Sequence, residues 1–147
     1  MTVLVIAMQV LLPIALIAWV AFLPAGSLAG FMLKVAGTGA SLFALAKVAQ
    51  WAVPIWWLPW VFGGLWLAAV LMEARPARGL SLGPSSGSGW LGIVVAAVLL
   101  GLGGWYSALA VAGRRLPPVE IVEIANPFGP GHYLVGNGGS NQLVNGH

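Results

Sequence analysis

The chain has 147 residues, of which 60% are hydrophobic and 6% are charged. Soluble domains carry about 25% charged residues, so this composition excludes an ordinary water-soluble domain and indicates that lipid is the main solvent. The net charge of +3 comes from scattered Lys and Arg residues without a basic stripe, so we expect no nucleic-acid partner. Cysteine is absent, which excludes disulfides and thiolate metal sites.

Four apolar segments come first, and we predict that they are transmembrane helices. Residues 3–23 form an uncharged run that would be roughly 31 Å long as a helix, about one hydrocarbon core. A retained span is favoured over a cleaved signal peptide, because no Lys or Arg precedes the run and it exceeds the usual apolar core of such peptides. The remaining spans are expected at about 28–48, 51–72 and 90–112. Three spans are the alternative, if a middle segment is re-entrant.

Two lysines fall within the second predicted span. Lys47 lies near one end, where its ammonium can snorkel to the headgroups. Lys34 lies about one and a half turns from the other end, and we expect it to snorkel too rather than to form an intramembrane site. The predicted spans contain no acidic residue to pair with Lys34, so a transporter or channel is the least favoured function.

Glycine and tryptophan indicate how the spans pack and where they meet the membrane surface. The Gly positions predicted to allow close helix packing are Gly26, Gly30, Gly37, Gly101 and Gly104, together with Gly39 and Gly103 on the same helices. The predicted interfacial anchors are Trp51, Trp56, Trp57, Trp60, Arg114 and Arg115. An aromatic cage for a cationic ligand is the less favoured interpretation of the Trp cluster.

The charged loops give a weak indication of orientation. Residues 73–89 are rich in Pro, Gly and Ser and are predicted to form a flexible loop. With four spans both termini lie on the same side. That side holds Lys47, Arg114 and Arg115, whereas the other holds Arg75 and Arg78. The margin of one positive residue leans towards a cytoplasmic C-terminus.

After the predicted spans the sequence is no longer continuously apolar. Residues 116–125 are predicted to be a Pro-containing linker. In residues 126–147, the β-prone runs 132–135 and 142–144 flank a segment of Gly and Asn, which favours a hairpin. The expected fold class is therefore mainly α and membrane, with about four transmembrane helices in residues 1–115 followed by a short, incomplete β-hairpin segment.

The C-terminal region also resembles a known family. The residues that carry the resemblance are Pro127-Phe128, Gly131 to Val135 (GHYLV), Asn137 to Asn141 (NGGSN) and Asn145 to His147 (NGH). They look like the opening of the catalytic domain in membrane-anchored lysostaphin-type zinc metallopeptidases, where several spans and a diproline linker come first. The Trp–Pro cluster at residues 51–60 and the exit at residues 114–118 are similar as well.

The resemblance implies that residues 126–147 begin a truncated, β-rich peptidase-like domain. In such enzymes a zinc-bound water attacks a peptide bond, often in peptidoglycan. The family supplies its ligands through a His/Asp pair and a later His-x-His, whereas this chain has no Asp and ends at His147. We therefore predict no catalytic residue, no metal ligand and no activity for this chain alone, with zinc expected in a complete family member. His147 and Asn145 are candidates for lining that site, and His132 for a surface position.

Two functions follow as expectations. The first is the integral membrane anchor of a zinc metallopeptidase-like protein that acts on cell-wall peptide. The lipid bilayer would be its partner, and peptidoglycan peptide the substrate of the complete protein. The alternative is a non-catalytic multi-span protein that serves assembly or partner binding through helix–helix association. The resemblance implies the bacterial inner membrane, with the C-terminal segment outside the cytoplasm.

Overall fold

The described part of the chain is helical throughout. The computed structural model describes residues 6–49 and 56–115, and within these ranges it contains no strand. A π-helical turn, η1 (Ala7–Leu11), continues directly into α2 (Leu12–Phe22). The helices α3 (Leu28–Val48), α4 (Leu58–Ala77) and α5 (Gly87–Ala112) follow. The prediction of four mainly apolar helices is confirmed here, while the predicted linker and hairpin lie outside the described residues.

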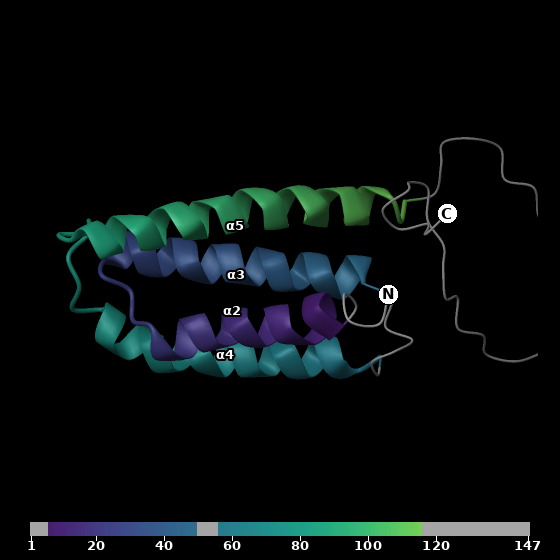
Figure 1. Cartoon of the computed structure of the whole chain (residues 1–147), viewed down its shortest axis with the longest axis horizontal. Helices are drawn as coiled ribbons and strands as arrows, with labels where there is room; N and C mark the ends of the chain where they lie inside the picture. Colours follow the sequence, from purple (N-terminus) through teal and green to yellow (C-terminus); the bar gives the residue numbers. More distant parts are fainter. Residues whose placement is uncertain (1–5, 50–55, 116–147) are drawn as a thin grey trace, which may run out of the picture.

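The helices form an elongated bundle in which consecutive helices run in opposite directions, so that α3 is parallel to α5 and α2 is parallel to α4 (Figure 1). The principal packing pairs are α3 with α5 and α2 with α4. The connections at residues 23–27 and 78–86 lie together at one end of the bundle, which we call the loop end. By length and composition, α3 and α5 are apolar enough to cross a membrane, and η1 with α2 forms a shorter apolar helix.

The predicted 73–89 loop is wrong at both of its ends. Residues 73–77 belong to α4, whose alanines favour helix. At the other end α5 begins at Gly87, because the Ser86 hydroxyl accepts a hydrogen bond from the Gly89 N–H at 3.2 Å and caps the helix. The true connection, residues 78–86, is correspondingly shorter.

The 78–86 connection is also attached to α3. Its carbonyls at Ser81 and Leu82 accept hydrogen bonds from the backbone N–H groups of Leu28 and Ala29, at 2.9 and 3.1 Å. The Ser27 hydroxyl accepts a further bond from Gly30 N at 3.1 Å. The first N–H groups of a helix have no partner within it, so these contacts stabilise the start of α3.

Glycine and serine bring α3 and α5 close together. A Cβ added at Gly37 would meet the Ala96 carbonyl oxygen of α5, and one added at Gly103 would lie 2.6 Å from the Ser41 backbone N of α3. The Ser41 hydroxyl donates to Leu99 O at 3.3 Å, and the Ser107 hydroxyl donates to Ala40 O at 3.2 Å. Small residues and hydroxyl bridges of this kind are typical of helix packing in membranes.

The other predicted packing glycines lie in different surroundings. Gly26 and Gly30 are close to α5, with added Cβ atoms 3.5 Å from Gly89 Cα and 3.6 Å from Ile93 Cγ1. Gly101 and Gly104 have no neighbour within 4 Å of an added Cβ. The close approach on α5 therefore occurs at Gly103, because the rotation of α5 turns Gly101 and Gly104 away from α3.

Candidate functional site

The most unusual feature of the bundle is a buried ion pair. The Lys34 Nζ of α3 lies 2.5 Å from the Glu73 Oε1 of α4, and the two side chains are only 4% and 6% exposed. Within the described ranges this is the one ion pair. Removing two charges from water is expensive, and their attraction offsets that penalty only when the geometry is good and further hydrogen bonds satisfy the remaining groups.

Those further hydrogen bonds come from the turn between α2 and α3. Lys34 Nζ donates to the Leu23 carbonyl at 2.8 Å, and Glu73 Oε1 accepts from the Ala25 backbone N–H at 2.7 Å. The pair therefore joins α3, α4 and the end of α2 at one point. The second carboxylate oxygen, Glu73 Oε2, is buried without a hydrogen-bond partner in the described residues.

The position of this pair corrects two sequence-based expectations. Lys34 is buried among the helices and does not snorkel to the membrane surface. The statement that no acidic residue lies in the spans is also wrong, since α4 continues through Glu73. The spacing of the two residues along their helices could have predicted the pair. Because α3 and α4 are antiparallel neighbours, Lys34 in the second turn of α3 and Glu73 near the end of α4 lie at similar depth in the bundle.

A second polar contact joins α3 and α4 about one turn further along α3. The Trp66 indole N–H donates to the Thr38 hydroxyl at 2.8 Å, and that hydroxyl donates to the Lys34 carbonyl at 2.7 Å. Thr38 is fully buried. The hydroxyl thus satisfies the indole N–H, which usually requires a partner when it is shielded from water.

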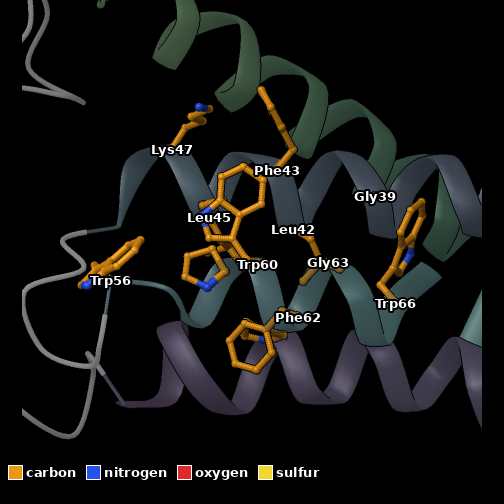
Figure 2. Close-up of a pocket in the computed structure, with 13 residues that line it drawn as sticks. Gly39, Leu42, Phe43, Leu45, Lys47, Trp56, Trp60, Phe62, Gly63 and Trp66 are labelled. Carbon is orange, nitrogen blue, oxygen red and sulfur yellow. The ribbon is translucent and has the colours of Figure 1, made fainter. Parts of the chain in front are cut away.

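The opposite end of the bundle contains a pocket of about 490 Å³ between α3 and α4 (Figure 2). Aromatic side chains dominate its lining. They are Phe43, Trp56, Trp60, Phe62 and Trp66. Pro13, Gly39, Leu42, Leu45, Ala46, Pro59 and Gly63 complete the apolar lining. Lys47 is the one charged residue that lines it, and its Nζ lies 5.6 Å from the centre of the Phe43 ring.

The predicted interfacial anchors gather near this pocket end. Trp56, Trp57 and Trp60 are exposed, while Trp51 lies outside the described residues. Arg114 donates to the Lys47 carbonyl at 2.5 Å and to the Ala110 carbonyl at 3.0 Å. Arg114 therefore satisfies carbonyls near the C-terminal ends of both α3 and α5. Arg115 is exposed beside it.

The described residues do not assemble a metal centre. Within them, no group of three or more His, Cys, Asp or Glu side chains is placed to hold a metal ion. The predicted site-lining residues Asn145 and His147, and also His132, lie outside the described part. A catalytic zinc requires three protein ligands and an open position, and the chain as a whole supplies two His and no Asp. The described residues, which include neither His, provide no such set.

Comparisons with protein-family models, with curated proteins and with solved structures found no match.

Proposed function

We propose that residues 1–115 are an integral membrane anchor. The observation that carries this proposal is the distribution of polarity, which is the reverse of that in a soluble protein. Buried polar side chains include Ser27, Lys34, Thr38 and Glu73, and alanines make up much of the buried apolar set. Large apolar side chains cover the outside, as at Phe22, Trp60 and Leu102.

This distribution suits lipid as the surrounding solvent. In a bilayer, exposed Leu, Val and Trp side chains are well solvated, whereas charges are stable when they face the bundle interior and pair with each other. In water the same bundle would expose apolar area on every helix, far beyond the few hundred Å² of contiguous patch that monomeric proteins tolerate. The length and hydropathy of α3 and α5 support the same placement.

Labelling of single cysteines tests this topology, since the chain has no native Cys. Ser85→Cys lies in the connection at the loop end, and Ser140→Cys lies in the C-terminal region. A membrane-impermeant maleimide should label Ser140→Cys in intact spheroplasts and Ser85→Cys only after permeabilisation. Labelling of both in intact spheroplasts would contradict a membrane-crossing bundle. A reversed pattern would contradict only the outside placement of the C-terminus.

The peptidase association is a second part of the proposal. It is supported by the resemblance of residues 126–147 to the opening of a lysostaphin-type catalytic domain, a family whose zinc ligands follow that opening segment. The test uses the protein isolated from its natural source, with any residues that follow His147. It should release peptides from peptidoglycan and lose that activity on treatment with a chelator.

A non-catalytic module is the alternative, and one observation favours it. Gly101 and Gly104 leave the backbone of α5 open on the outside of the bundle, where a partner helix can approach closely. If the natural protein released no peptides from peptidoglycan, this alternative would be favoured over the peptidase anchor.

A further inference from the structure

We propose that the pocket between α3 and α4 binds one acyl chain of an anionic phospholipid, with the lipid phosphate at Lys47. This inference rests on the proposed membrane location. It assigns to the pocket a ligand class that a simple anchor does not require.

The size and lining of the pocket suit an apolar chain. Its volume of about 490 Å³ lies within the range of about 300–1,000 Å³ found for small-molecule sites. Twelve of its thirteen lining residues are apolar, aromatic or glycine. Trp60, at the pocket, is 78% exposed, so the cavity is reached from the side of the bundle that would face lipid.

The pocket has a direction that matches a lipid. Figure 2 shows Lys47 and Trp56 near one end and Trp66 at the other. Gly39 and Lys47 are eight residues apart on α3, which corresponds to roughly 12 Å along the helix. Trp and Lys are typical of the headgroup level, so the cationic end lies at the interface and the aromatic slot extends towards the hydrocarbon.

Charge decides which headgroup fits. Lys47 is exposed and has no carboxylate partner among the described residues, and no acidic side chain lines the pocket. The Arg114 guanidinium adds a second positive charge, since it bonds to the Lys47 carbonyl. A cationic ligand, as in an aromatic cage, would be repelled by these groups. A headgroup with a net negative charge is attracted, whereas the trimethylammonium of phosphatidylcholine offsets its phosphate.

Photo-crosslinking in vesicles tests the proposal with the full chain. The vesicles consist of phosphatidylcholine with a small fraction of a probe lipid that carries a diazirine in its acyl chain. The anionic probe is phosphatidylglycerol, and the zwitterionic probe is phosphatidylcholine. Adducts are mapped by mass spectrometry. We expect the anionic probe to label residues 42–47 and 59–66 about fivefold more than the zwitterionic probe, as one Lys near an anionic surface implies.

Two pairs of variants identify the residues involved. In Lys47→Gln, the two probes should label the pocket residues to nearly the same extent. Arg115→Gln removes an equal charge outside the pocket lining, so it should leave the preference for the anionic probe intact. Gly63→Leu should reduce pocket adducts by filling the slot. Its control is Gly64→Leu, because Gly63 lines the pocket and Gly64 does not, while an added Cβ at either meets no neighbour within 4 Å.

The outcomes separate the two proposals. Adducts spread evenly over the exposed helix faces, without enrichment in the pocket, would overturn the lipid site and leave the membrane anchor standing. Equal loss of preference in Lys47→Gln and Arg115→Gln would also overturn it. So would a Gly63→Leu variant that changes association between copies of the chain but not lipid labelling. A chain without adducts to either probe would overturn the membrane anchor itself.

Discussion

At the residue scale, Glu73 keeps a buried lysine charge compensated. Replacing Glu73 by Gln retains an acceptor for the Ala25 N–H but removes the negative charge 2.5 Å from Lys34 Nζ. Breaking one side of a buried pair is destabilising by about 3–5 kcal/mol, because the other charge remains buried and uncompensated. Reversible unfolding in mixed detergent, followed by Trp fluorescence, should show this loss.

A double variant provides the control for that measurement. Lys34→Met combined with Glu73→Gln removes both charges, so the protein should recover most of the stability lost in Glu73→Gln alone. If the double variant were less stable than Glu73→Gln by a further several kcal/mol, the ammonium bond to Leu23 O would be the dominant contribution instead.

Lys34 and Glu73 also show what the sequence could not predict. Lys34 is visible as a charge inside an apolar run, and its distance from the helix end is compatible with snorkelling. Which way it points depends on the rotation of α3 about its own axis, and that rotation is set by contacts with other helices. Glu73 falls at the start of the predicted loop, because that prediction follows the Pro, Gly and Ser content of residues 73–89. Its burial beside Lys34 explains why the helix continues past Met72.

At the scale of the elements, Gly103 controls the separation of α3 and α5. Gly103→Leu would place side-chain atoms where the backbone of Ala40 and Ser41 lies, so the helices would have to move apart. We expect a loss of about 1–3 kcal/mol, as for other overpacked sites. Gly104→Leu is the matched control on the adjacent residue. It meets no neighbour and should be neutral or stabilising by up to about 1 kcal/mol from helix propensity.

Equal unfolding midpoints for the two variants would contradict the packing described for α5. A destabilised Gly104→Leu with an unchanged Gly103→Leu would instead favour a partner helix on the outer face. The sequence alone does not distinguish Gly101, Gly103 and Gly104, because all three lie within about one turn of α5 and face different directions. Only the contact with Ser41 selects Gly103.

At the scale of the whole molecule, the apolar exterior makes an unusual prediction for a surface substitution. Val98 lies near the middle of α5 and is 54% exposed. An exposed Val→Lys change is nearly neutral in a soluble protein, but at the centre of a membrane helix it is unfavourable by about 2.5–3.5 kcal/mol on insertion scales. Val98→Lys should therefore lower the fraction of chain that resists carbonate extraction from membranes.

Leu82→Lys is the control for this substitution. Leu82 is 78% exposed and lies in the connection at the loop end, so a lysine there should leave extraction unchanged. Equal behaviour of the two variants would contradict a bilayer around α5.

Hydropathy was sufficient to predict the helices, because apolar runs of this length have few alternatives. It was insufficient to predict how they pair. The close partner of α3 is α5, although α4 separates them in the sequence, and small residues on both helices decide that pairing. The pocket was likewise not predictable from Trp56 and Trp60 alone, since its wall also needs Pro13 of α2 and Gly39 of α3.

The separation of Lys34 and Glu73 along the chain has a consequence for biogenesis. The two residues are 39 positions apart, and synthesis at about 5–20 residues per second leaves roughly 2–8 seconds between their emergence from the ribosome. During that interval the lysine of α3 has no counter-charge, and a lone charge is poorly tolerated in hydrocarbon. We therefore expect α3 to wait at the translocation machinery and to enter the bilayer together with α4, as a helical hairpin that is already neutralised.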